Sequence, residues 1–354
     1  MPRLTVPLLL LLLGLPAALQ AHHSFFGRFD NSTHQELEGV VTRLHWENPH
    51  IHIFLETADG TEWDLESGSP TLMQRAGIPR DAIKEGMTIR VAAWPPLTDK
   101  VEAFATNVLL PDGTELLMQT GQDAYFKDEV TGDFSYRFRT EGDRSQPERG
   151  IFRMWTFTGA DGFLFPESIN RDYDIAANYP LTDTALAVFH NFDLARDNPT
   201  NNCQPKGMPL IMEQPLPMEI LRDGNDVVLR IEEYDLRRTI HVGESGAPAG
   251  TPFSLLGYSW GWWEGGQPWA PDSTLVARTT HISFPWLNQR GIPLSRAAGI
   301  EERFTMIEDG AFMDYQMVVT DAINLTTPVH LSKKWIHVPG VEILPFACEE
   351  YAGE

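Results

Sequence analysis

The sequence predicts an all-β protein, with a small OB-like barrel followed by a larger antiparallel, up-and-down (lipocalin-like) barrel or sandwich. Two observations predict this class. Short apolar runs with period-two alternation recur along the chain, and turn signals such as Ala58-Asp59-Gly60-Thr61 separate them. Glycine and proline, with 28 and 26 residues, are more frequent than average and favour turns and short strands over long helices.

The small barrel is expected within residues 22–118. Ser69-Pro70 is typical of a helix start, and Gly77 is typical of the end of that helix. Three strands, one helix and two further strands are the element order of an OB fold. The expected strands cover residues 36–45, 50–56, 62–66, 88–93 and 103–110, and the helix covers 71–76.

The larger barrel is expected within residues 150–354, after a polar linker at 119–149. Turn markers such as Asp223-Gly224-Asn225 separate roughly eight apolar segments, as in a closed antiparallel barrel or a sandwich. Residues 182–191 are the one helix predicted in this half. The strands are expected at residues 151–157, 216–220, 227–234, 239–242, 275–281, 301–307, 311–320 and 329–338.

The acidic charge of the chain excludes a nucleic-acid partner. There are 27 basic and 49 acidic side chains, which give a formal net charge of −22. A nucleic-acid binder needs a basic face that displaces counterions from phosphates, and the longest basic cluster here is Lys333-Lys334. The oligonucleotide binding that is common among OB folds is therefore not expected. A small molecule or a metal ion is the predicted partner, and the oligomeric state is left open.

Residues 1–21 are predicted to be a cleavable signal peptide. Their apolar core, which includes the leucine run 8–13, has about ten residues and is too short to span a bilayer of roughly 30 Å. This length favours a signal peptide over a retained membrane anchor. Cleavage is expected after Ala21, and it leaves a periplasmic or secreted protein that begins at His22 and has no membrane span.

Cys203 and Cys348 are the two cysteines of the chain, and both lie in the part that is predicted to be exported. In an oxidising compartment an even pair of cysteines indicates one disulfide. Two buried free thiols are the alternative. A metal site at either cysteine is not expected, because no second Cys or His lies within a few residues of it.

Several short motifs carry a resemblance to a known family. In the first half they are His22-His23-Ser24-Phe25, Leu37-Glu38-Gly39-Val40-Val41, Trp46-Glu47-Asn48-Pro49-His50 and the spaced residues Trp63, Glu66 and Ser69-Pro70. Over residues 22–118 the chain resembles DUF6152, an exported bacterial family of unknown function with an "HHS…NPH" signature. The resemblance implies export and fold, and it implies no biochemical activity.

Residues 150–350 resemble the uncharacterised β-rich region that is commonly joined to that family. The shared motifs include Glu233-Tyr234-Asp235, Trp263-Glu264-Gly265 and Cys348-Glu349-Glu350. The resemblance also supports the pairing of the two cysteines. One departure is Tyr258, which stands where that region usually has a histidine, so any role of that histidine is lost here.

Histidines supply the constellation that predicts metal chemistry. A mature chain that begins at His22 offers an α-amino group and an imidazole Nδ1 in one chelate ring, and His23 adds a second imidazole. Nitrogen ligands of this kind suit Cu(II) in tetragonal geometry. His50, from the Asn-Pro-His motif, is the expected third ligand. The predicted copper site therefore consists of His22, His23 and His50, if the N-terminal segment folds back onto the mouth of the small barrel.

Further ligands and alternatives remain open for this site. His52 lies two residues beyond His50 on an expected strand and therefore faces the same side, and His45 and Glu66 are weaker candidates. Cleavage one residue earlier leaves Ala21-His22-His23, a copper or nickel chelate with a different geometry. Alternatively, the two N-terminal histidines form a solvated chain start and His50 only completes a turn.

A second hypothesis is a carrier for an apolar small molecule, held by aromatic residues in the larger barrel. In a strand, Trp260 and Trp262 share one face and Trp263 takes the other. Such a stripe could line a pocket in the mouth of a barrel, and the alternative is that the rings fill the barrel core. The predicted ligand-binding residues are Tyr258, Trp260, Trp262, Trp263 and Trp286, with Trp269 nearby.

The third hypothesis is an enzyme of isomerase, hydratase or hydrolase type that acts on an apolar small molecule. Glu233 and Asp235 are spaced so that two carboxylates share one strand face, which suits acid–base chemistry. Glu264, beside the tryptophans, is the third catalytic candidate. The alternative is that these carboxylates belong to a structural network of ion pairs.

Overall fold

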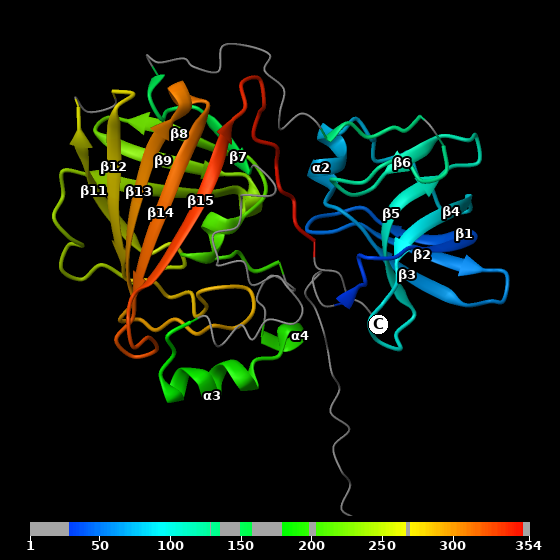
Figure 1. The fold of residues 1–354 in the computed structure, drawn as a ribbon, viewed down its shortest axis with the longest axis horizontal. Helices are drawn as coiled ribbons and strands as arrows, with labels where there is room; N and C mark the ends of the chain where they lie inside the picture. Colours follow the sequence, from blue (N-terminus) through cyan, green and yellow to red (C-terminus); the bar gives the residue numbers. More distant parts are fainter. Residues whose placement is uncertain are drawn as a thin grey trace, which may run out of the picture.

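The structure is a computed structural model, and it describes residues 28–127, 129–134, 149–157, 179–197, 203–266 and 270–349. Two closed β structures stand beside each other in it, and the last described stretch of the chain, drawn in red, passes between them (Figure 1). The all-β class predicted from the sequence is confirmed.

The small barrel has the pairing of an OB fold. Strand β1 pairs antiparallel with both β2 and β4, and β3 pairs with β2 and, in parallel, with β5. Because β4 also pairs with β5, the sheet closes on itself. Six elements follow the predicted order: β1 (Gln35–His45), β2 (His52–Thr57), β3 (Glu62–Glu66), α2 (Pro70–Arg75), β4 (Thr88–Trp94) and β5 (Glu102–Leu109). A further short strand, β6 (Glu115–Leu117), pairs with β5 and was not predicted.

The side chains of β2 and of the residue before it alternate between the core and the outer face of the small barrel. Ile51, Ile53 and Leu55 are completely buried in that core. Because successive side chains in a strand point to opposite faces, His52 and Phe54 lie on the outer face. That face is partly covered, since the Arg43 guanidinium lies 3.8 Å from the centre of the Phe54 ring. The period-two alternation thus presents the histidines of this segment outward.

The beginning of the stretch that was expected to be a linker packs on the small barrel. The buried Glu115 carboxylate accepts hydrogen bonds from the backbone N–H groups of Tyr125, Phe126 and Lys127, at 2.7–2.9 Å. Thr131 forms a parallel bridge with Leu116. One buried carboxylate therefore fixes this part of the chain, and residues 135–148 lie outside the described part.

The larger barrel is closed by nine strands, in the order β10-β11-β12-β13-β14-β15-β7-β8-β9. All neighbours are antiparallel except β10 and β11, which are parallel because residues 243–257 carry the chain back along the barrel. The strands are β7 (Met154–Phe157), β8 (Met218–Asp223), β9 (Asp226–Ile231), β10 (Leu236–Val242), β11 (Tyr258–Gly265), β12 (Ser273–Thr280), β13 (Gly299–Ile307), β14 (Phe312–Thr320) and β15 (Val329–His337).

Two features differ from the eight-stranded, up-and-down expectation. The ninth strand is β11, the tryptophan-rich stretch, whose inner face carries the small residues Ser259 and Gly261. An added Cβ at Gly261 would lie 2.4 Å from the Val276 carbonyl oxygen, so only glycine fits there. Because Ser259 and Gly261 precede Trp263 on this inner face, most of β11 lacks the usual alternation of large apolar and polar residues. The parallel pair also breaks the up-and-down order once.

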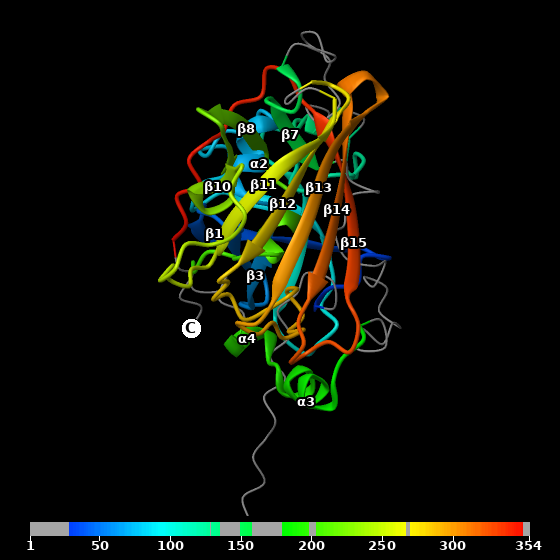
Figure 2. The ribbon, with the colours of Figure 1, turned by 90° about the vertical axis from the view of Figure 1, so that its left-hand side faces the viewer.

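The helices lie at one end of the larger barrel. Figure 2 shows strands β11 to β15 running together along the barrel, with α3 (Asp183–Asn191) and α4 (Leu194–Asp197) beyond their lower end. Helix α3 was predicted, and the Thr182 hydroxyl caps it by accepting a hydrogen bond from the Ala185 N–H. No helix in the described ranges is long and apolar enough to cross a membrane.

The interior of the larger barrel contains a segment of the chain itself. The 3-10 turn Leu210–Glu213 is in the same buried cluster as Trp155, Phe304 and Trp335. The inward-facing Lys333 of β15 donates hydrogen bonds from Nζ to the carbonyl oxygens at positions 212, 213 and 214, at 3.0–3.2 Å. This turn therefore occupies part of the space that a carrier of the lipocalin type keeps for its ligand.

A buried ion pair crosses the same interior. Arg238 of β10 and Glu302 of β13 have side chains that are almost fully buried, and Nη1 lies 2.8 Å from Oε1. Tyr315 donates its hydroxyl to the same Oε1 at 2.6 Å, and Arg238 Nη2 also donates to the Thr279 hydroxyl at 2.8 Å. Both charges are thus neutralised and hydrogen-bonded, which is the condition for burying them.

The C-terminal segment connects the two barrels. Cys348 is bonded to Cys203, 145 residues away in the sequence, so the predicted disulfide is present. Phe346 is buried in the core cluster of the small barrel, although β15, which precedes this segment, belongs to the larger one. Arg75 of α2 forms an ion pair with Glu232, at the end of β9, with 2.6 Å between Nη1 and Oε1.

Arg238→Met is expected to lower the free energy of unfolding by about 3–5 kcal/mol, because it leaves the Glu302 carboxylate buried without its charge partner. Combining Arg238→Met with Glu302→Leu should recover most of this loss, since an apolar pair no longer leaves a buried charge. Urea unfolding measures both variants. Arg230→Met is the control, because its ion pair with Glu219 is exposed and should matter by less than about 1 kcal/mol. A double variant as unstable as the single one would contradict this account.

Candidate functional site

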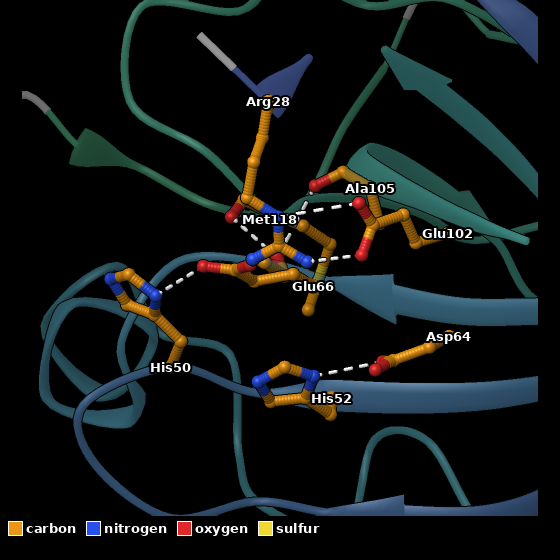
Figure 3. A network of polar contacts seen from close by, with 9 residues as sticks. Arg28, His50, His52, Asp64, Glu66, Glu102, Ala105 and Met118 are labelled. Atoms are coloured by element: carbon orange, nitrogen blue, oxygen red, sulfur yellow. Dashed lines mark hydrogen bonds and ion pairs between the residues drawn. The ribbon is translucent and has the colours of Figure 1, made fainter. Parts of the chain in front are cut away.

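The predicted site lies around Glu66, a buried residue at the end of β3. Its Oε1 accepts a hydrogen bond from His50 Nδ1, and its Oε2 lies 2.6 Å from Arg28 Nη1 (Figure 3). Arg28 in turn donates to the carboxylate of Glu102, at the start of β5. One buried carboxylate therefore joins the first described residue of the chain to the histidine of the Asn-Pro-His motif.

The chain around Arg28 is docked firmly on the small barrel. The Arg28 carbonyl oxygen accepts a hydrogen bond from the Leu97 N–H at 2.7 Å, and the Asp30 N–H donates to the Pro95 carbonyl at 2.8 Å. Phe29 is 2% exposed and packs against Phe104, with 5.8 Å between the ring centres. Residues 28–30 are therefore held beside β4 and β5, close to the Glu66 carboxylate.

Electrostatics keep Glu66 ionised. Burial by itself raises the pKa of this carboxyl, but the neighbouring His50 and Arg28 outweigh it, and the resulting pKa lies well below its usual range. An ionised carboxylate only accepts hydrogen bonds. His50 Nδ1 must therefore carry the hydrogen that it shares with Glu66, which leaves Nε2 of a neutral ring as a lone-pair donor. The His50 side chain is 44% exposed, so solvent and ligands can reach it.

A second histidine repeats this arrangement. His52 Nδ1 lies 2.8 Å from Asp64 Oδ1, and His52 is paired with Glu66 across β2 and β3. His45, at the end of β1, is paired with His52, and their ring centres are 6.4 Å apart. The pKa of His45 is lowered by burial and then by His52. The strands thus bring His45, His50, His52 and Glu66 to one end of the small barrel.

The two N-terminal histidines, His22 and His23, lie outside the described residues. Within the described part of the chain, no three His, Cys, Asp or Glu side chains are placed to hold a metal ion together. A metal site at His50 therefore needs further ligands from outside the described residues. Arg28 and Glu102 could not be recognised as members of the cluster from the sequence, because only the folded barrel brings these distant segments together.

The aromatic candidates do not converge inside the larger barrel. Trp260 and Trp262 share one face of β11 and Trp263 takes the other, as the alternation predicts, but the shared face is the outer one. Trp263 packs against the barrel core. The Trp262 ring is covered by the Arg278 guanidinium, which lies 5.3 Å from the ring centre, and its indole N–H donates to the Glu264 carboxylate. Trp269 lies outside the described residues.

The other two aromatic candidates lie apart from the tryptophans of β11. Tyr258 stacks on His241, with 4.9 Å between the ring centres, and its hydroxyl donates to Glu244. Trp286 lies in the connection between β12 and β13 and packs edge-on against Phe192, with 4.7 Å between the ring centres. The five residues therefore do not form a common lining in the lumen.

The three catalytic candidates are also separate. Residues Glu233–Asp235 form a 3-10 turn in which Tyr234 has a φ of 61°, so the expected strand ends at Ile231 and its alternation does not apply. Glu233 forms an ion pair with Lys206 at 2.7 Å, and Asp235 accepts the backbone N–H of Phe346. Glu264 is paired with Arg303 on the outer face of the barrel, also at 2.7 Å.

Glu213, which lies near Glu233, has a strongly raised carboxyl pKa. It was not among the site residues predicted from the sequence. Burial raises the pKa of Glu213 to about 7, with a smaller contribution from Glu233, while Lys333 and Lys206 act in the opposite direction. Its Oε2 atom is buried and has no hydrogen-bond partner among the residues that the structure describes. The sequence could not indicate this, because the burial results from the insertion of the 3-10 turn into the barrel.

The comparison with protein families bears on the small barrel. Residues 10–103 match the family of unknown function DUF6152. The match extends from the predicted leader into β5 and includes Arg28, His50, Glu66 and Glu102, so the resemblance inferred from the motifs is confirmed for this segment. No family covers the C-terminal region. No curated protein matches the chain.

Glu213→Gln is expected to flatten the pH dependence of stability. Because folding raises the pKa of Glu213 from 4.5 to about 7, the folded protein holds a proton that the unfolded chain releases. This contribution is fully present below pH 4.5 and is lost as the pH rises through 7. Relative to wild type, the variant should therefore gain about 2 kcal/mol of unfolding free energy between pH 5 and pH 8.

Urea unfolding at pH 5 and pH 8 measures this gain. The matched control is Glu301→Gln, which removes an exposed carboxyl of β13 that is paired with Arg278. If the unfolding free energies of wild type and Glu213→Gln change in parallel between pH 5 and pH 8, the burial of the Glu213 carboxyl inside the barrel is contradicted.

Proposed function

We propose that the protein is exported, that its leader is cleaved after Ala21, and that the mature chain binds Cu(II) through His22, His23 and His50. The observation that supports this most directly is the shared carboxylate of Glu66. It orients His50 and also holds Arg28, the first described residue after the predicted N-terminal histidines.

The spacing of the N-terminal segment fits this site. His22 lies six positions before Arg28, and six extended residues span at most about 20 Å. A chain start within that reach of Glu66 can fold back to His50. The α-amino group and Nδ1 of His22 then supply two nitrogen ligands in one chelate ring, and the imidazoles of His23 and His50 supply two more. Four nitrogen donors are a ligand set that Cu(II) prefers.

The residues around His50 resemble those that orient a metal-binding histidine. Histidines that bind metals usually donate their other ring N–H to a carboxylate or a carbonyl, which fixes the tautomer and the ring orientation. Glu66 takes this part for His50, and its own second oxygen is held by Arg28. His52, with Asp64 as its partner, has the same arrangement and is a reserve ligand on the same face.

Export is supported by the cysteines. The bond between Cys203 and Cys348 fits an oxidising compartment such as the periplasm or the extracellular space. A copper site built on the α-amino group of His22 also requires a processed N-terminus, so export and metal binding depend on the same cleavage. Sequencing of the mature N-terminus tests this step by itself.

The carrier and enzyme hypotheses receive less support. A carrier needs an open lumen lined by aromatic rings, but the 3-10 turn Leu210–Glu213 occupies the core, and Trp260 and Trp262 face outward. An enzyme built on Glu233, Asp235 and Glu264 needs these carboxylates together, and each has a separate partner. Metal binding is therefore the function that the geometry favours.

His50→Ala is expected to weaken Cu(II) binding by at least about 100-fold, because it removes a ligand, and Glu66→Gln by about 10- to 100-fold, because it removes the partner that orients this ligand. Isothermal titration of the protein that begins at His22 measures both affinities. His330→Ala is the matched control, since His330 is an exposed histidine of β15. A protein with an additional Ala before His22 should also bind more weakly, because the chelate ring at the amino terminus changes.

Two results would contradict the proposal. One is a wild-type protein beginning at His22 that takes up no Cu(II). The other is an affinity that is the same in wild type, His50→Ala and His330→Ala, which would place the metal away from the small barrel.

A further inference from the structure

The loop that carries His50 is supported from outside the small barrel by the C-terminal end of the chain. Asn48 is 4% exposed, and its side-chain Nδ2 donates to the carbonyl oxygen of Phe346. Its backbone oxygen accepts a hydrogen bond from the Glu349 N–H at 3.2 Å, and it forms a parallel bridge with Cys348. Asn48 thus has three contacts with the last described residues, and it lies two residues before His50.

Both barrels hold this C-terminal segment along its length. The Phe346 ring is buried in the core of the small barrel and lies 4.7 Å from the ring of Tyr234, which belongs to the turn after β9. Arg75 of α2 donates to the carbonyl of Glu342 at 2.8 Å, and the Leu344 N–H donates to Glu232 at 2.9 Å. The segment therefore forms a short strap across the two barrels.

The end of the strap buries one side chain and is otherwise held by hydrogen bonds to Asn48 and Asp235. Between positions 344 and 349 only Phe346 is buried, and the residues around it are exposed or half-buried. A segment with so few buried side chains detaches readily unless it is tied down. The tie here is the disulfide, which joins Cys348 to Cys203 at the position where the strap pairs with Asn48.

We infer that the Cys203–Cys348 disulfide is a redox-sensitive clamp that holds His50 in the position required for copper binding. The inference rests on the proposed function, since it assigns regulation to the same site. With the bond intact, the strap keeps Asn48 in place, and His50 stays within hydrogen-bond distance of Glu66. With the bond broken, the strap end detaches part of the time, and the loop from Trp46 to His50 loses its outer support.

The chemistry of release needs a dithiol reductant. A thiolate of the reductant attacks one sulfur of the half-buried disulfide, the S–S bond breaks, and a mixed disulfide forms. The second thiolate of the reductant resolves it. Two electrons pass to the protein, two protons complete the thiols of Cys203 and Cys348, and the reductant leaves as a disulfide.

The size of the effect follows from the fraction of time that the strap is bound. The apparent dissociation constant equals the intrinsic constant divided by the population of the binding-competent state. If the unclamped strap is bound for about a tenth of the time, Cu(II) affinity falls about tenfold. Because Cys203 and Cys348 lie outside the proposed ligand set, the number and type of copper ligands stay the same.

The test compares wild type with Cys203→Ser/Cys348→Ser, both beginning at His22, by Cu(II) titration and by amide hydrogen exchange without metal. The serine pair is used because free thiols would themselves bind or be oxidised by Cu(II). The clamp predicts a loss of affinity of about tenfold and faster exchange in residues 46–51. Exchange in β4 should stay as in wild type and serves as the internal reference.

The other outcomes separate the two proposals. Equal copper affinity and equal exchange of residues 46–51 in both proteins would overturn the clamp and leave the copper site standing. Faster exchange spread equally over both barrels would also overturn it, since the disulfide would then be a general stabiliser. A wild type that binds no Cu(II) would overturn the proposed function, while local exchange at residues 46–51 would still decide whether the clamp exists.

Discussion

The buried carboxylate of Glu66 is the interaction on which the arrangement of the small barrel's open end depends. Glu66 is the last residue of β3. One of its carboxylate oxygens accepts a hydrogen bond from the His50 ring, and the other accepts one from the Arg28 guanidinium. A buried carboxylate is tolerated only with such partners, because an unpaired charge in that position costs several kcal/mol. The charge of Glu66 therefore links the Arg28 segment and the His50 loop, which are distant in the sequence.

Residues 346–349 contact the same end of the small barrel. The strap from β15 pairs with Asn48, and the disulfide at Cys348 ties it to a loop of the larger barrel. The larger barrel is closed, and its interior holds the Arg238–Glu302 pair and an inserted turn of its own chain. Its contribution to the site is therefore mechanical, since it anchors the strap that supports the loop of His50.

Much of this could be predicted from the sequence where a local rule applies. Alternation along 50–56 predicted that His50 and His52 face the same side, and an even pair of cysteines in the part predicted to be exported indicated the disulfide. Local rules failed where tertiary contacts decide. The Glu233–Asp235 strand face was wrong because Tyr234 adopts a left-handed conformation that ends β9. Glycine and serine on the inner face of β11 concealed a barrel strand, and neither Arg28 nor Glu213 is recognisable before the distant segments around it are assembled.

The central claim is that His50 and the processed N-terminus bind the same metal ion, and pulsed EPR of the Cu(II)-loaded protein beginning at His22 tests it most directly. Each copper-bound imidazole contributes a coupling from its remote nitrogen. The account predicts that His50→Ala removes one such coupling while those of His22 and His23 remain. A spectrum in which His50→Ala changes no imidazole coupling would contradict it, because the copper would then bind without the histidine that Glu66 orients.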